Sequence, residues 1–280
     1  MSKLTKSNKS TIRNRLGRAR CGPQSAIKHP VLFVGAGPGD PELITVKGKR
    51  ALQEADLVIY AGSLVPEAIL KWTRPETQTI NSASMHLDEI IAEIEAANAA
   101  GKRVVRLHTG DPSLYGAILE QMAELQKRSI QYRVIPGVTA AFAAAAAMGI
   151  EFTLPQISQT LILTRMAGRT PVPESENLLS LAQHQTSMAI YLSISLIDEV
   201  AGILVKSYGP EAGCAVVYCV SQPDERIIIT RLKNLAQTVA AEKITRNALV
   251  IVGKVLDVDL LELKHKSNLY DQNFKHGHRK

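Results

Sequence analysis

Two short glycine-rich turns carry the residue types best suited to bind a small molecule. GAGPGDP at 35–41 follows the apolar run VLFVG, and HTGDP at 108–112 follows RVVRL. Glycines let ligand atoms approach backbone amides, and Asp111 can either cap the next helix or pair with a cationic or hydroxylated ligand. Because each turn follows a predicted strand, both are expected at the carboxyl edge of one sheet, where open α/β folds bind ligands.

The first turn differs from the dinucleotide-binding pattern. Asp40 occupies the sixth position of GxGxxG, and the second predicted strand ends in YAGS at 60–63 without an acidic residue to hold a ribose. Asp56 precedes that strand and fits a helix–strand turn. The turn therefore predicts a nucleotide-like ligand, but not NAD(P).

Three further stretches offer polar groups. PGVTA at 136–140 presents a bare backbone and the Thr139 hydroxyl before an alanine-rich helix. In TLILTRMAGRTPVPE, Arg165 and Arg169 flank a glycine and precede two prolines that stiffen the loop. Paired guanidiniums there suit either carboxylate recognition or surface salt bridges. His86 and His108 fit a base, a carboxylate partner or a structural role.

The chain contains no pattern for covalent or metal-dependent catalysis. A Ser/His/Asp order, a nucleophile elbow, a P-loop and a zinc-type Cys/His spacing are all missing from the sequence. The sequence therefore predicts no protein-bound metal and no nucleophilic side chain.

The elements that must position these turns alternate between strand and helix in the first half of the chain. Such alternation predicts an α/β domain with a largely parallel sheet. The expected strands are 31–35, 57–61, 103–108 and 131–135, and the expected helices are 41–54, 86–99 and 114–127.

The pattern restarts after Pro155. Because 226–231 follows 214–219 too closely for a helical crossover, these two strands predict an antiparallel hairpin and hence a mixed sheet. The other expected strands are 160–165, 187–193 and 248–254, with helices at 195–206 and 232–242. We divide the chain into a basic, disordered extension (1–29), two α/β domains (30–153 and 154–260) and a basic tail (261–280).

The net charge of +7 over 280 residues comes from the two ends of the chain. Residues 1–30 carry eight basic groups and no acid, whereas 31–263 carry 20 basic and 25 acidic residues. A nucleic-acid protein would carry its positive field on the folded surface, so we expect no nucleic-acid partner. Solvated tails fit better than binding arms.

Cysteine content and hydropathy bear on the compartment. Cys21, Cys214 and Cys219 form no CxxC, and the last two lie in an apolar strand, as expected for buried thiols in a reducing compartment. No apolar run is long enough for a membrane span. The Arg/Ser-rich N-terminus fits a transit peptide or a dispensable extension, and we expect a cytoplasmic protein.

Taken together, these phrases resemble the tetrapyrrole methylases, S-adenosylmethionine-dependent enzymes of corrin and sirohaem synthesis. VGAGPGDPELITVKG, the second Gly-Asp-Pro turn and PGVTA match the family as a whole. HTGDPSLYGAILEQ, SASMHLDE and ILTRMAGRTPVPE are similar to the branch that methylates C-11 of precorrin-4 or cobalt-precorrin-4 in cobalamin biosynthesis. The resemblance covers residues 30–258.

The resemblance implies two α/β domains, the first with a mostly parallel sheet and the second with a mixed sheet, a cofactor cleft between them, and a homodimer. Its substrate would be a precorrin, with S-adenosylmethionine as methyl donor. Matching the motifs assigns the cofactor to Pro38, Thr109, Gly110, Asp111, Leu114, Thr139, Ala140, Leu192 and Val216. In this reading Leu192 and Val216 approach the adenine.

The same implied reaction needs alignment more than acid–base chemistry, because a sulfonium is already a good methyl donor. We expect Asp111, Arg106 and His86 to serve at the catalytic centre, with Asp111 mainly positioning the cofactor. Arg165, Arg169 and His86 are expected to bind the carboxylates of the substrate.

Other readings stay open at this point. The chain could belong to another branch of the family that methylates a different ring carbon, or to the related diphthine synthases. It could also be a non-catalytic S-adenosylmethionine-binding protein of the pathway, or act on nucleic acid through its tails.

Overall fold

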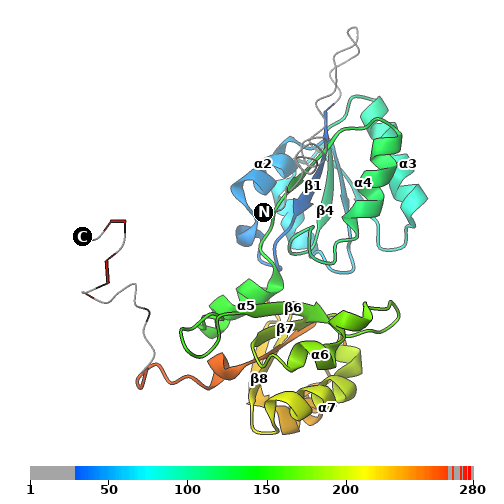
Figure 1. Ribbon diagram of the computed structural model, residues 1–280. Coiled ribbons are helices and arrows are strands. Elements are labelled where there is room, and N and C mark those ends of the chain that lie inside the picture. Colours follow the sequence, from blue (N-terminus) through cyan, green and yellow to red (C-terminus); the bar gives the residue numbers. More distant parts are fainter. Residues whose placement is uncertain (1–28, 264–266, 268–271, 273, 276, 279–280) are drawn as a thin grey trace, which may run out of the picture.

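The computed structural model describes residues 29–263, together with 267, 272, 274–275 and 277–278. The predicted basic extension, apart from residue 29, and much of the predicted tail lie outside these residues. Within them the chain forms two α/β domains, each built around its own five-stranded sheet (Figure 1). None of the helices in the described part of the chain has the length and apolar content that a bilayer crossing requires.

The first sheet is parallel throughout and has the order β3-β2-β4-β1-β5. Its central strands read as continuous apolar runs because helices cover both faces. Figure 1 shows α2 on one face and α3 and α4 on the other. The elements are β1 (Val31–Gly35), β2 (Leu57–Tyr60), β3 (Gln78–Asn81), β4 (Val104–His108), β5 (Tyr132–Ile135), α2 (Val46–Glu54), α3 (Leu87–Ala99) and α4 (Ile118–Lys127).

The helix predicted over 41–54 is divided in two. Asp40 accepts a hydrogen bond from the Glu42 amide at 2.8 Å and starts a single 3₁₀ turn, Pro41–Leu43. The Thr45 hydroxyl then accepts from the Gly48 amide at 3.1 Å and caps α2. The sequence therefore carries two successive cap signals, of which the prediction used the first.

The second sheet is mixed and has the order β6-β7-β10-β8-β9. Its one parallel pair is β6 with β7, and the predicted antiparallel hairpin is confirmed as β8 with β9. The strands are β6 (Leu161–Arg165), β7 (Ser187–Tyr191), β8 (Gly213–Tyr218), β9 (Arg226–Arg231) and β10 (Ala248–Val252). Helices α6 (Leu178–Ala182), α7 (Ile197–Tyr208) and α8 (Leu235–Ala241) cover one face.

Helix α5 (Ala140–Met148) covers the other face of the second sheet. Its fully buried residues Ala141 and Ala144 pack with Ala189 and Ala215, so small side chains meet on both sides of the contact. The predicted boundary at 153 assigned this helix to the first domain, whereas its packing joins it to the second. Figure 1 shows α5 between the two sheets.

Two helical glycines give opposite predictions for stability. Gly202 lies exposed on α7, and a Cβ there would meet nothing within 4 Å, so Gly202→Ala should raise the free energy of unfolding by about 0.5–1 kcal/mol through a lower entropy of the unfolded chain. Gly48 lies on α2, and a Cβ there would come within 2.9 Å of an Ile44 side-chain carbon and 3.1 Å of one from Val34. Gly48→Ala should therefore destabilise the protein.

Thermal and urea unfolding of both variants against the parent protein measure the difference. If both variants changed the free energy of unfolding in the same direction, the packing described for α2 and α7 would be contradicted.

Candidate ligand-binding site

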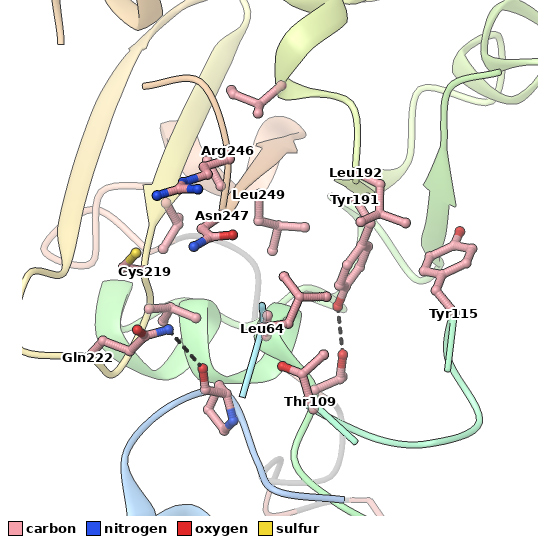
Figure 2. Close-up of a pocket in the computed structure, with 18 of the residues that line it drawn as sticks. Leu64, Thr109, Tyr115, Tyr191, Leu192, Cys219, Gln222, Arg246, Asn247 and Leu249 are labelled. Atoms are coloured by element: carbon pink, nitrogen blue, oxygen red, sulfur yellow. Dashed lines mark hydrogen bonds between the residues drawn. The ribbon is translucent and has the colours of Figure 1, made fainter. Parts of the chain in front are cut away.

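A cavity of about 540 Å³ lies between the two domains and receives residues from both (Figure 2). Its first-domain wall comes from the loops that follow β1, β2 and β4. Its second-domain wall comes from the ends of β7, β8 and β10. Eight of the nine predicted cofactor residues line it: Pro38, Thr109, Gly110, Asp111, Leu114, Thr139, Ala140 and Leu192.

The two glycine turns contact each other directly. Gly110 donates its backbone N–H to the Gly37 carbonyl at 2.8 Å, and Gly37 donates to the Gly110 carbonyl at 3.3 Å. Gly37 has a φ of +80° and Gly110 a φ of +58°, and glycine adopts both angles without strain. A Cβ on Gly35 or Gly137 would lie only 2.6 Å or 2.1 Å from the Gly110 carbonyl oxygen. Glycine is therefore required for the three segments to meet at the cavity.

Asp111 joins the second turn to the PGVTA segment. One carboxylate oxygen accepts from the Ser113 amide at 2.8 Å, and the other accepts from the Gly137 amide at 2.9 Å. Tyr115 and Ala117 then adopt left-handed φ angles of 55° and 48°, so α4 begins only at Ile118, later than the predicted 114. Asp111 thus fixes a loop along the cavity instead of capping a helix.

Tyr191, at the end of β7, holds the start of α5 on one side of the cavity. Its hydroxyl accepts from the Ala141 amide at 2.9 Å and is 2.7 Å from the Thr139 hydroxyl. The Tyr115 ring lies 5.7 Å from the Tyr191 ring, centroid to centroid, and Figure 2 shows the two side by side. Burial raises the pKa of Tyr191 above its usual value, so the phenol stays neutral. Sequence analysis missed Tyr191, although a tyrosine closing an apolar strand was a usable signal.

A contact between the two domains lies at the first glycine turn. The Asp40 amide donates to the Ser221 hydroxyl at 3.0 Å, and the Gln222 side-chain amide donates to the Pro38 carbonyl at 3.5 Å. The turn that carries these side chains has left-handed φ angles at Cys219 (45°) and Ser221 (62°). These hydrogen bonds hold the first glycine turn of the first domain against the second domain.

One predicted cofactor residue lies on the wrong face of its strand. Val216 is fully buried in the core between the second sheet and its helices, whereas its neighbour Val217 lines the cavity. Successive side chains of a strand point to opposite faces, so a register error of one residue exchanges the two. The predicted place of Val216 at the cavity is therefore wrong, and Val217 lines the cavity instead.

The structure does not bring Arg106 or His86 to the cavity. Arg106 is 5% exposed and donates to the Gln121 side chain at 3.1 Å and to the Ile59 carbonyl at 3.2 Å, inside the first domain. Burial lowers the pKa of its guanidinium to about 10, so the charge remains at neutral pH. His86 is exposed at the start of α3, where its backbone N–H donates to the Glu89 carboxylate at 2.9 Å. Their predicted catalytic roles are replaced by structural ones.

Arg165 is committed to its own loop. Its guanidinium donates to the carbonyls of Met166 at 3.3 Å, Thr170 at 3.0 Å and Pro171 at 2.7 Å. These bonds occupy donors that a carboxylate would need, so Arg165 shapes the loop instead of clamping a ligand. Arg169 lies exposed within the same loop, outside the residues that line the cavity.

The basic residue that does line the cavity, Arg246, was not singled out from the sequence. It belongs to the TRN stretch before β10, which reads as an ordinary polar turn, so no pattern distinguished it. The one acidic residue of the lining is Asp111. Within the described residues, no cluster of three or more His, Cys, Asp or Glu side chains could hold a metal ion.

Two stacked α/β domains, with a cavity between them that is bordered by glycine-rich turns, define a class of enzymes. Residues 30–236 match the model of the tetrapyrrole (corrin/porphyrin) methylases, and the chain belongs to that family of methyltransferases.

Within the family, particular relatives are very similar. A cobalt-precorrin-4 C(11)-methyltransferase from Methanocaldococcus jannaschii is 52% identical over 251 residues, covering 89% of this chain and 96% of the relative. A precorrin-4 C(11)-methyltransferase from Pseudomonas aeruginosa is 43% identical, covering 89% of this chain and 98% of the relative.

Solved structures agree with the fold. The crystal structure of a cobalt precorrin-4 methyltransferase superimposes with a TM-score of 0.81 at 42% identity, covering 84% of this chain and 99% of that one. A uroporphyrin-III C-methyltransferase from Thermus thermophilus, complexed with S-adenosylhomocysteine, has a TM-score of 0.68 at 27% identity, covering 82% of this chain and 100% of that one.

His108 predicts an acid-sensitive stability. The ring is 4% exposed and stacks on Phe33 at 5.8 Å, and its Nε2 is buried without a hydrogen-bond partner among the described residues. Burial, reinforced by the charge of Arg106, lowers its pKa from 6.5 to about 3. Between these values the unfolded chain binds a proton that the folded protein does not, so this residue makes stability fall by about 1.4 kcal/mol per pH unit as pH drops below 6.5.

Urea unfolding of the parent protein and of His108→Phe between pH 6.5 and 4.5 tests this contribution. The difference in unfolding free energy between the two proteins should change with pH in the stated direction. A difference independent of pH would show that His108 titrates normally in the fold.

Proposed function

We propose that this chain transfers a methyl group from S-adenosylmethionine to C-11 of precorrin-4 or of its cobalt form, a step of cobalamin biosynthesis. The observation that carries the proposal is the combination of 52% and 43% identity to C(11)-methyltransferases, over nearly their full length, with a cavity between the two domains. The structural neighbour complexed with S-adenosylhomocysteine supports the choice of methyl donor.

The cavity suits a reaction that depends on alignment. A sulfonium transfers its methyl group without a protein nucleophile, and correct orientation of two reactants supplies roughly 7–11 kcal/mol at the upper end of known cases. The described walls offer rigid backbone and apolar surface from Pro38, Leu114, Val217 and Leu249. Such walls can hold a donor and an acceptor carbon in line.

For the donor, we assign the eight predicted residues that line the cavity, with Val217 in place of Val216. Thr109, Gly110 and Asp111 then lie beside the methionine end and the ribose, and Leu192 and Val217 beside the adenine. Asp111 serves as a positioning residue, because both of its carboxylate oxygens already accept backbone N–H groups.

For the acceptor, the propionate and acetate groups of the macrocycle need cations. We assign Arg169 to this role, held on the loop that Arg165 organises. The proposal also includes a homodimer and a cytoplasmic location, both expected from the sequence. A metal-free and a cobalt-containing substrate stay equal candidates.

Incubation with methyl-labelled S-adenosylmethionine and each precorrin-4 form tests the function. We expect label transfer, with NMR locating the new methyl group at C-11. A methyl group at another ring carbon would assign the chain to a different branch of the family. Cofactor binding without transfer to any precorrin would favour a non-catalytic S-adenosylmethionine-binding protein.

Removal of the Asp111 carboxylate should abolish or strongly weaken cofactor binding. Asp111→Ala leaves the Ser113 and Gly137 amides without their acceptor, so the loop loses its fixed path along the cavity. We expect at least a tenfold rise in the Kd for S-adenosylhomocysteine. The binding free energy lost in such a rise is about that contributed by one hydrogen bond to a charged group. Titration calorimetry gives the Kd.

Asp40→Ala is the matched control, because Asp40 is the carboxylate of the other Gly-Asp-Pro turn and accepts from the Glu42 amide outside the cavity lining. Its effect on binding should be clearly smaller. An Asp111→Ala variant that folds and binds normally would remove Asp111 from the site.

A further inference from the structure

Arg246 stands out among the described cations because it lines the cavity, is exposed and has no partner for its charge. It has no hydrogen-bond or ion-pair partner within the described residues, and it is the one basic side chain of the cavity lining. Nearby arginines of the same domain are already paired. Arg226 donates to the Glu242 carboxylate at 2.9 Å, and Arg231 donates to the Asp257 carboxylate.

The backbone holds Arg246 in place from both sides. Before it, Ile244 is 3% exposed and donates its N–H to the Val239 carbonyl at 3.1 Å. After it, Asn247 adopts a left-handed φ of 54°, and its carbonyl accepts from the Cys219 amide at 2.9 Å. The segment that presents the guanidinium is therefore fixed to the turn that also contacts Pro38 and Asp40.

Figure 2 shows Arg246 and Asn247 on the side of the cavity away from Tyr115. The acidic residue of the cavity lining, Asp111, accepts hydrogen bonds from two backbone amides. The cavity thus presents one partnered anion and one unpartnered cation to whatever enters it.

We propose that Arg246 is a carboxylate-binding residue of this cavity and helps to select its ligand. The inference rests on the proposed function, since both proposed ligands carry carboxylates: the methionine end of the cofactor has one, and the macrocycle has several. A guanidinium is always charged and presents a fork of N–H donors that matches a carboxylate in geometry. Because Arg246 is exposed and its guanidinium has no partner among the described residues, its donors are available to a carboxylate that enters the cavity.

The test compares Arg246→Gln with the parent protein in three measurements. Calorimetry gives the Kd for S-adenosylhomocysteine, and separately for 5′-methylthioadenosine, which lacks the amino-acid carboxylate. Steady-state kinetics gives KM and kcat for precorrin-4. Arg246→Lys keeps the charge without the fork, and Arg50→Gln removes an exposed arginine of α2 that has no ion-pair partner among the described residues.

Two results support the proposal and identify the source of the carboxylate. If the cofactor supplies it, Arg246→Gln weakens S-adenosylhomocysteine about tenfold or more and leaves 5′-methylthioadenosine unchanged. If the macrocycle supplies it, both Kd values stay unchanged and the KM for precorrin-4 rises by a similar factor with little change in kcat. In either case Arg246→Lys should recover part of the loss, and Arg50→Gln should behave as the parent protein does.

Other results overturn the proposal. Unchanged constants in all three measurements would show that Arg246 binds no carboxylate. Equal weakening of both nucleosides would place the side chain against the adenosine instead, and a lower melting temperature with the same loss would show a purely structural role. The parent protein is measured before any variant. If it binds neither nucleoside and methylates no precorrin, the proposed function itself is overturned, and this outcome is distinct from a failure of the Arg246 variants alone.

Discussion

The structure depends on the close approach of three backbone segments at the carboxyl edge of the first sheet. The turns after β1, β4 and β5 meet at Gly35, Gly110 and Gly137, where a Cβ on the first or third would lie 2.6 Å or closer to a carbonyl oxygen. Because side chains are excluded there, the three segments pack through their backbones, and Gly110 at their junction lines the cavity. The reciprocal hydrogen bonds of Gly37 and Gly110 then keep the two Gly-Asp-Pro turns facing the same space.

The second domain completes the cavity and bonds to the first glycine turn. Ser221 and Gln222 make these bonds, and Tyr191 holds the start of α5, which packs on the second sheet. This arrangement suits methyl transfer, in which the protein contributes mainly orientation. A reaction that depends on orientation needs few charged groups, and the cavity lining contains two, Asp111 and Arg246. Of these, Arg246 is the one whose charge has no partner among the described residues.

The cations illustrate how far residue type alone can mislead. Arg106, Arg165 and His86 each suit a carboxylate ligand chemically, yet the fold uses the first two to satisfy carbonyls and side-chain amides and the third to begin a helix. A guanidinium has several N–H donors, and nearby backbone oxygens compete with a ligand for them. The backbone oxygens have the advantage because they are already in place, whereas a ligand loses entropy when it binds. Sequence shows which groups are present, whereas only the packed structure shows which donors remain unused.

The sequence by itself determined the strands that are buried on both faces, the hairpin and the glycine turns, because continuous apolar runs and short glycine-rich connections are local signals. It failed at β3, a largely exposed edge strand with no apolar run. Only the tertiary structure decided that Val217 and not Val216 faces the cavity, that α5 packs on the second sheet, and that Arg246 lines the cavity. Those facts depend on strand register and on contacts between residues far apart in the chain, which no local pattern encodes.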